Sequence, residues 1–179
     1  MTQNINNAYQ TIDHPLSPLY TKESQILILG SFPSVKTREY GFFYGHPQNR
    51  FWPVMERIFN EELSTNIEER RRFLIKHKIA VYDSIYQCDI VGSSDASIKN
   101  VVPSDLKAIF EQAPIQQVFC NGTTSYKYYQ KYHAKEARIK GVKLPSTSPA
   151  NARFRLDDLL REWKKILDYL EVETNRKSL

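Results

Sequence analysis

The feature of this sequence that most constrains its fold is a fourfold alternation of short apolar runs with helix-like segments. Short apolar runs bounded by Gly, Pro or Asp are typical of strands buried on both faces of a parallel sheet. The predicted strands are Gln25–Leu29, Ile79–Tyr82, Gln117–Cys120 and Ile139–Leu144. The sequence therefore predicts an α/β fold of three layers (α/β/α), with helices on both faces of a central four-stranded parallel sheet.

Helix signals occur between these runs. A helix is expected from about Phe51, because Pro53 suits a first helical turn. Thr65-Asn66-Ile67-Glu68 has the pattern of a capping box that opens a second helix, which runs to about Lys76. Further helices are expected from Pro103-Ser104-Asp105 and after Asn121-Gly122. The last helix has a clear apolar stripe, formed by Leu159, Leu160, Trp163, Ile166, Leu167 and Leu170. The remaining long segments, 31–50 and 84–102, are expected to be loops.

Length and composition indicate one domain. The chain has 179 residues, of which 41% are hydrophobic, enough for a single full core. We assign residues 25–171 to one domain. Residues 1–24 are polar and are expected to form an N-terminal arm packed on that domain, and residues 172–179 to form a solvated tail.

Charge and cysteine content limit the classes of partner and of metal site that the chain can have. The formal net charge of +5 permits a polyanionic partner without proving one. Cys88 and Cys120 are far apart and form no CxxC pair, which argues against a disulfide scaffold, a zinc site and an iron–sulfur cluster. No apolar stretch reaches the length of a membrane span, and no signal-peptide pattern is present. We therefore expect a cytoplasmic monomer with no membrane contact, no metal, no cofactor and no obligate protein partner.

Polar and aromatic clusters follow each predicted strand. In a parallel sheet the loops after the strands share one edge, which is where ligands bind. The first loop is rich in rings, with Phe32 and Tyr44 among them, followed by the imidazole and amides of His46, Gln48 and Asn49. Rings beside amide groups suggest a pocket for a flat polar molecule such as a nucleobase.

Several candidate residues have two interpretations. Asn49 either caps the following helix or holds a water or a reacting group. Asp83 either caps a turn or accepts hydrogen bonds from the edge of a base. Ser31, in Gly30-Ser31-Phe32-Pro33-Ser34, either forms a tight turn or lines the pocket, and His46 either packs on Pro47 or contacts the base.

Two later loops have groups that suit phosphates. Asn121-Gly122 precedes a helix whose first N–H groups form a ready anion site. Pro145-Ser146-Thr147-Ser148 offers small hydroxyl groups on a stiffened backbone, and Arg153 follows with a positive charge.

The motifs resemble those of a known family. Tyr44–Trp52, with the sequence YGHPQNRFW, resembles a segment of the uracil-DNA glycosylase superfamily in its mismatch-specific branch. The combination with GSFPS, Asp83-Ser84, Gly92-Ser93-Ser94-Asp95 and LPSTSPANA is more similar to the hypoxanthine-DNA (deoxyinosine) glycosylase branch. The resemblance covers about Gln25 to Trp163.

The resemblance implies a monofunctional glycosylase without metal. It implies that Tyr44 stacks on the flipped base, that Asp83 reads the base, and that the segment 144–151 contacts the DNA backbone and supplies a wedge. Phe32 stands where the uracil branches have a catalytic Asp or Asn, so the resemblance implies Asn49 as the catalytic residue. The remaining base-binding candidates are Ser31, Phe32 and His46. The backbone and wedge candidates are Ser34, Asn121, Gly122, Pro145, Ser146, Thr147, Ser148, Asn151 and Arg153.

The expected function is therefore base-excision repair. The protein would flip a deaminated base, with hypoxanthine favoured, out of DNA and hydrolyse its N-glycosidic bond, leaving an abasic site. The alternatives are a glycosylase directed at uracil or xanthine and a non-catalytic nucleic-acid-binding module. A nucleotide hydrolase that uses Asn121-Gly122 as its phosphate cradle is a further rival.

Overall fold

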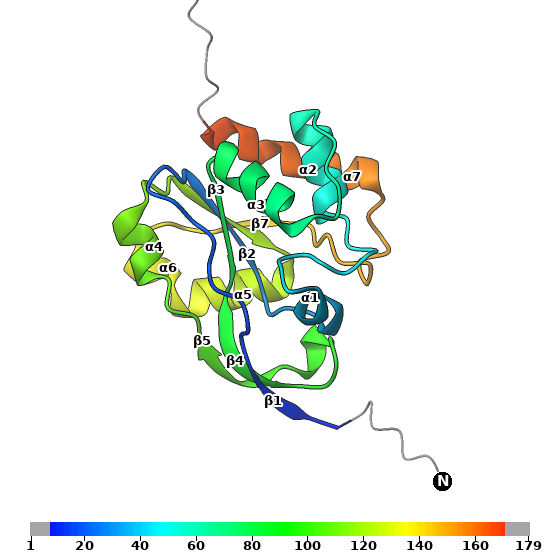
Figure 1. The fold of residues 1–179 in the computed structure, drawn as a ribbon. Helices are drawn as coiled ribbons and strands as arrows, with labels where there is room; N and C mark the ends of the chain where they lie inside the picture. Colours follow the sequence, from blue (N-terminus) through cyan, green and yellow to red (C-terminus); the bar gives the residue numbers. More distant parts are fainter. Residues whose placement is uncertain (1–7, 171–179) are drawn as a thin grey trace, which may run out of the picture.

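A computed structural model describes residues 8–170 of the chain and contains the predicted parallel sheet (Figure 1). Its four strands have the order β3-β2-β6-β7, and every neighbouring pair is parallel. The strands are β2 (Ile26–Gly30), β3 (Ile79–Asp83), β6 (Gln117–Asn121) and β7 (Val142–Leu144). The predicted fold class is confirmed, although β7 begins three residues later than the sequence indicates.

Helices cover both faces of this sheet. Figure 1 shows α2, α3 and α7 on one face and α5 on the other. The first group is α2 (Phe51–Phe59), α3 (Ile67–Lys76) and α7 (Leu156–Trp163), which continues as the 3-10 helix η3 (Lys164–Tyr169). The opposite side has α5 (Thr123–Tyr132). Two shorter helices are α4 (Lys107–Gln112) and α6 (Ala134–Ala137). Ile26 to Leu29 are fully buried between the layers, as the unbroken apolar run predicts.

The prediction of a loop over residues 84–102 is wrong. This segment contains β4 (Ile85–Ile90), the 3-10 helix η2 (Asp95–Ser97) and the first residues of β5 (Lys99–Pro103). Together with β1 (Gln10–Asp13) these strands form an antiparallel sheet of order β1-β4-β5. Register shifts interrupt the pairing of β4 with β5, so the buried residues of β4 do not alternate regularly with exposed ones. The period-two signal of a strand is lost for that reason.

The segment expected to be an N-terminal arm is built into both sheets. Its strand β1 pairs with β4, and Leu19 forms a bridge with Val81 of the parallel sheet. Within the first predicted loop the chain also forms a short helix, α1 (Val35–Tyr40). The predicted solvated tail, 172–179, lies outside the described residues.

The N-cap of α3 is Asn66, one residue later than predicted, and its N–H donates to Ser64 Oγ at 3.1 Å and not to Glu69, so the reciprocal bond of a capping box is not formed. Asn66 has the extended backbone of a cap, and its side chain accepts a hydrogen bond from the Glu69 N–H at 3.0 Å. The Glu69 carboxylate in turn accepts the N–H of Ser64 at 3.0 Å. Thr65 and Glu68 therefore do not form the predicted pair.

Two absences apply to the described part of the chain. No helix between residues 8 and 170 is long and apolar enough to cross a membrane. In the same range, no group of three His, Cys, Asp or Glu side chains is suited to ligate a metal ion.

Candidate active site

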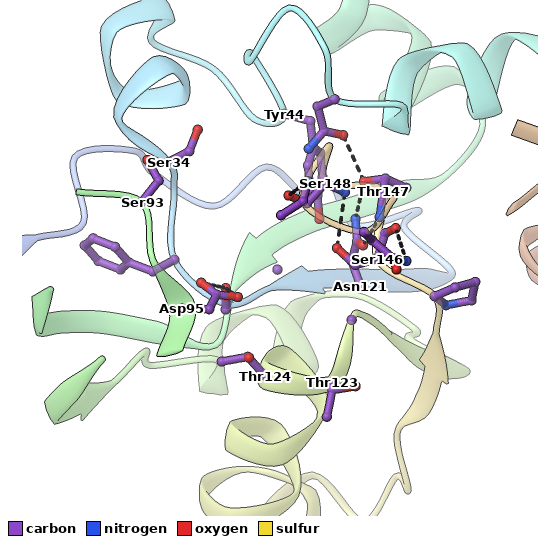
Figure 2. A pocket seen from close by; sticks show the side chains of 18 of the residues that line it. Ser34, Tyr44, Ser93, Asp95, Asn121, Thr123, Thr124, Ser146, Thr147 and Ser148 are labelled. Carbon is purple, nitrogen blue, oxygen red and sulfur yellow. Dashed lines mark hydrogen bonds between the residues drawn. The ribbon is translucent and has the colours of Figure 1, made fainter. Parts of the chain in front are cut away.

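A pocket of about 960 Å³ lies at the carboxyl edge of the parallel sheet (Figure 2). The loops after all four parallel strands contribute to it, as expected for this class of sheet. Its size suits an extruded nucleotide. The predicted site residues that line it are Ser31, Phe32, Ser34, Tyr44, Asn49, Asp83, Asn121, Gly122, Pro145, Ser146, Thr147, Ser148, Asn151 and Arg153.

His46 is not among the lining residues. Its Nδ1 accepts the N–H of Gln48 at 3.0 Å, and its carbonyl accepts the N–H of Asn49 at 2.9 Å. His46 therefore shapes the turn that presents Asn49, and its predicted contact with the base has no support in this geometry.

Asn49 is held by two hydrogen bonds at the start of α2. Its Oδ1 accepts the Phe51 N–H at 2.9 Å and the Thr147 hydroxyl at 2.8 Å. Because an N–H group must point at an oxygen, the orientation of the amide is determined. Nδ2 has no hydrogen-bond partner among residues 8–170, and Asn49 lines the pocket. Asn49 thus satisfies a helix terminus and presents a free donor, so the two interpretations of this residue are compatible.

Thr147 connects Asn49 to Asn121. Its Oγ1 accepts a hydrogen bond from Asn121 Nδ2 at 2.9 Å, and its N–H donates to Asn121 Oδ1 at 3.0 Å. Thr147 is fully buried, so it cannot reach a DNA phosphate in this structure, contrary to the role suggested for it. Its hydroxyl instead fixes the two asparagine side chains that border the pocket.

Arg50 fastens the loop that follows β7. Its guanidinium donates hydrogen bonds to the carbonyl oxygens of Ser148, Asn151 and Phe154. The Ser146 hydroxyl accepts the Ser148 N–H at 3.2 Å, which leaves its own O–H free to donate. The tip of the loop, which includes Arg153, is exposed.

Asp83 is the last residue of β3 and lies at the other end of the sheet edge. Its Oδ2 pairs at 2.6 Å with Nε2 of His14, and both side chains are buried. Oδ1 has no hydrogen-bond partner within the described part of the chain. A Cβ placed on Gly30 would lie 2.2 Å from Oδ1, so only glycine fits beside this carboxylate.

A second carboxylate, Asp95, lines the pocket from η2, and Figure 2 shows it across the pocket from Asn121 and Thr147. The Ser31 hydroxyl is 3.1 Å from both of its oxygens. Asp95 is accessible from the pocket, but the protein around it displaces enough water to raise the pKa of its carboxyl. The Ser31 hydrogen bond opposes this pKa shift, and the Asp83 charge adds to it.

Tyr44 and Phe32 supply the aromatic part of the site. The Tyr44 ring stacks on Phe51 with centroids 4.0 Å apart, so one face of it is covered. Its hydroxyl is buried without a hydrogen bond of good geometry. Burial raises the pKa of Tyr44 well above its usual value, with a further rise from Asp83 and an opposing effect from Asn121. Phe32 is 8% exposed and contacts His14 edge-to-face, so only its margin is open to a ligand.

The remaining predicted residues have local structural roles as well. The Ser34 side chain caps α1 by accepting the Thr37 N–H at 3.1 Å. Gly122 has a φ of 95° and would place a Cβ 3.1 Å from Ser146, so this turn requires glycine. Ser34 and Gly122 still line the pocket.

Some lining residues were missed by the sequence analysis. They are Thr37, Lys143 and Glu162. Ser93 and Asp95 belong to Gly92-Ser93-Ser94-Asp95, a motif that was noted without a role. His14 gives no local signal at all, because it precedes a proline in a polar segment.

Comparisons with known proteins find relatives of this chain in sequence and in fold. Two curated relatives named "Hypoxanthine DNA glycosylase" come from Methanosarcina barkeri and Methanosarcina acetivorans. The first is 33% identical over 141 residues, which cover 76% of this chain and 86% of that protein. The second is 30% identical over 135 residues, which cover 74% and 84%.

A solution NMR structure from Methanosarcina acetivorans, of a candidate uracil DNA glycosylase, has the same fold. Its TM-score is 0.72 at 23% identity, and the match covers 88% of this chain and 99% of the other. The family model of the Uracil DNA glycosylase superfamily matches residues 17–171. This chain therefore belongs to the Uracil DNA glycosylase superfamily.

Proposed function

We propose that this protein hydrolyses the N-glycosidic bond of hypoxanthine in DNA and leaves an abasic site. The two relatives that carry the hypoxanthine name support this substrate. The observation that carries the proposal is the amide of Asn49. Its oxygen is occupied by two donors and its nitrogen is free at the pocket.

Asn49 acts as a hydrogen-bond donor in this proposal. Nδ2 holds the oxygen of the attacking water near C1′ of the extruded nucleotide. With Oδ1 already occupied, Asn49 is poorly placed to take a proton from that water. A reaction in which the C1′–N9 bond breaks first needs no strong base, because the cationic sugar is attacked readily by water. The bonding electrons leave with the purine, which takes up a proton, and the water adds to C1′ and releases a proton that replaces the one taken up by the purine.

The carboxylates of the pocket affect the charge with which the purine leaves. Asp83 and Asp95 both line the pocket, so an anionic purine is disfavoured there. The base therefore leaves in a protonated, neutral form. Asp95, whose pKa is raised by burial, is suited to hold a proton near the base.

The rim of the pocket suits a DNA strand. The Ser146 and Ser148 hydroxyls, the Gly122 turn and Arg153 are donors or positive charges beside the opening. Arg153 is the exposed candidate for the wedge, because Phe154 is half-buried against the core.

An excision assay tests the proposal. Oligonucleotides with one deoxyinosine, deoxyuridine or deoxyxanthosine are incubated with the protein and cleaved with alkali at abasic sites. We expect cleavage at deoxyinosine, and its loss in Asn49→Ala with DNA binding retained. Cleavage only at deoxyuridine or deoxyxanthosine would overturn the substrate. Salt-dependent binding without any cleavage would favour a non-catalytic module.

The absence of a strand-cleaving lyase step needs its own test, because Lys143 lines the pocket. Borohydride added during excision traps any Schiff base between a lysine and the sugar. We expect no covalent protein–DNA product. A product lost in Lys143→Arg would make the enzyme bifunctional.

We also propose that the enzyme acts on DNA as a monomer in the cytoplasm. The pocket is formed by residues of one chain, which supports the monomeric state. Light scattering of the protein in solution is expected to give one chain of 21.0 kDa, and a dimer mass would contradict it.

A further inference from the structure

The segment before β2 places a buried histidine directly behind the pocket. The His14 ring is fully buried, and its Nε2 lies 2.6 Å from Oδ2 of Asp83. The backbone around it is anchored, because the His14 N–H donates to the Tyr86 carbonyl and β1 pairs with β4. The imidazole therefore has a defined position relative to the carboxylate.

The hydrogen bonds of His14 determine which nitrogen carries the proton. Its Nδ1 accepts the N–H of Leu16 at 3.1 Å, so Nδ1 has a lone pair. The proton is then on Nε2, which donates to Asp83 Oδ2. His14 is a neutral donor here, and Asp83 is an acceptor through Oδ2.

This arrangement leaves one oxygen of Asp83 for a ligand. Oδ1 has no partner among the residues that the structure describes, and Asp83 lines the pocket beside Gly30. The aromatic neighbours Phe32 and Tyr82 contact the His14 ring and restrict its rotation. Because Oδ2 is fixed by His14, Oδ1 points in a constant direction.

We infer that His14 is a positioning residue that holds Asp83 so that Oδ1 accepts the ring N–H of the extruded base. This inference rests on the proposed function. Hypoxanthine presents an N1–H, and xanthine and uracil also present a ring N–H on the corresponding edge. Adenine has a lone pair at N1, so the same carboxylate oxygen would repel it. By holding Asp83, His14 thus contributes to the distinction between hypoxanthine and adenine, whereas guanine, which also has an N1–H, is not excluded by this contact.

The inference makes a specific demand on the variant Asp83→Asn. His14 still donates from Nε2, so the new amide must turn its oxygen toward His14. Its NH₂ group then faces the pocket, where it opposes the ring N–H of hypoxanthine. We expect excision of deoxyinosine to fall by about a hundredfold or more.

His14→Gln should reverse this loss. A glutamine amide of similar reach can donate to Asp83 or, after rotation, accept from an asparagine at position 83. His14→Gln alone is expected to lose less than about tenfold in the single-turnover rate of excision. In the double variant with Asp83→Asn, the glutamine oxygen accepts the NH₂ group and turns the asparagine oxygen to the pocket. We expect excision to recover by at least about tenfold relative to Asp83→Asn alone.

A purely structural role for His14 predicts a different pattern. If the imidazole served only to pack, His14→Phe would retain excision. The double variant of His14→Gln with Asp83→Asn would then excise deoxyinosine more slowly than either of its single variants. We expect His14→Phe to fold but to lose about ten- to a hundredfold in the single-turnover rate of excision, because Asp83 has no donor to fix it. Thermal unfolding of each variant identifies losses that come from misfolding.

The assay is single-turnover excision of deoxyinosine by the full chain, with binding to an abasic-site oligonucleotide as the second readout. Recovery in the double variant supports the inference. An additive or more severe loss in a folded double variant overturns it. If the wild-type protein excises no base, the proposed function fails instead, and the two failures are distinguished by that single control.

Discussion

The two sides of the pocket differ in chemistry and in origin. The amide side, formed by Asn49, Asn121 and Thr147, follows β2, β6 and β7 and is neutral. The acidic side is formed by Asp83 at the end of β3 and Asp95 in η2, with His14 of the N-terminal segment behind Asp83 and Ser31, which follows β2, beside Asp95. Figure 2 shows Asp95 and the pair Asn121–Thr147 facing each other across the cavity.

This difference in charge suggests that the two sides act on different parts of the nucleotide. Neutral amides and hydroxyls can hold a water or a phosphate without repelling a cationic sugar by their own charge. Carboxylates accept N–H groups and can store a proton, which suits the purine. On this view the amide side acts on the sugar and the acidic side acts on the base.

The largest expected effect tests the amide side through Asn49→Asp. Aspartate keeps the oxygen that accepts from Phe51 and Thr147, and it is favourable at a helix N-terminus. It lacks the free NH₂ group. We expect excision to fall by about a thousandfold while the melting temperature is unchanged or higher. Single-turnover kinetics and calorimetry measure the two quantities.

Asn49→Ala is the matched variant. It loses both the NH₂ donor and the oxygen that accepts from Phe51 and Thr147, so it should lose the same activity and also about 1 kcal/mol of stability. If Asn49→Asp were nearly as active as the wild type, the free NH₂ group would have no part in the reaction, and the amide side would be structural.

Thr147→Val tests whether the amide side works as one unit. Valine has the shape of threonine but cannot connect Asn49 to Asn121. We expect kcat to fall by about ten- to a hundredfold, and stability to fall by about 1 kcal/mol because Asn121 Nδ2 loses its partner in a half-buried position. Thr147→Ser keeps the hydroxyl and should retain most of the activity. Equal losses in Val and Ser would assign the effect to packing.

The two sides also differ in how well they could be predicted. The amide side follows apolar strands with clear ends, and a long motif includes Asn49, so its position at the sheet edge was predicted correctly. Its internal bonds were not, because a buried hydroxyl such as Thr147 gives the same sequence signal as an exposed one. The parallel strands β2, β3 and β6 were found because each has a continuous buried apolar run, whereas β7 has only Leu144 buried and its start was placed three residues too early.

The acidic side was harder to predict. The irregular register of β4 and β5 hides the alternation that reveals a strand, so Asp95 was placed in a loop. His14 meets Asp83 across 69 positions of sequence, and no local pattern reports such a contact. The part of the site that depends on long-range pairing was therefore missed.

Asp95→Asn tests the acidic side. The pKa of Asp95 is raised mainly by burial, so its protonated form persists to a higher pH than that of an ordinary aspartate. If this proton serves the leaving purine, wild-type excision falls as the pH rises through that pKa. The asparagine variant should be about tenfold slower at low pH and should approach the wild type at high pH. Profiles that run parallel over the whole range would exclude Asp95 as the proton source.

The smallest expected effect concerns His133, which lies behind the acidic side, and the pH dependence of stability. His133 is buried with Nε2 3.3 Å from the carbonyl oxygen of Ser84, the residue after Asp83. Burial lowers the pKa of His133 below 6.5, and the Ser84 carbonyl only partly opposes this shift. The unfolded chain therefore binds the proton more readily than the folded one. The stability from this group is present above pH 6.5 and is lost as the pH falls through the lower, folded-state value.

His133→Gln, which cannot titrate, should reduce the dependence of the melting temperature on pH in this acidic window by a few degrees. If the variant and the wild type lost stability in parallel, the acid sensitivity would arise elsewhere, and the acidic side would be no more sensitive to protonation than the amide side.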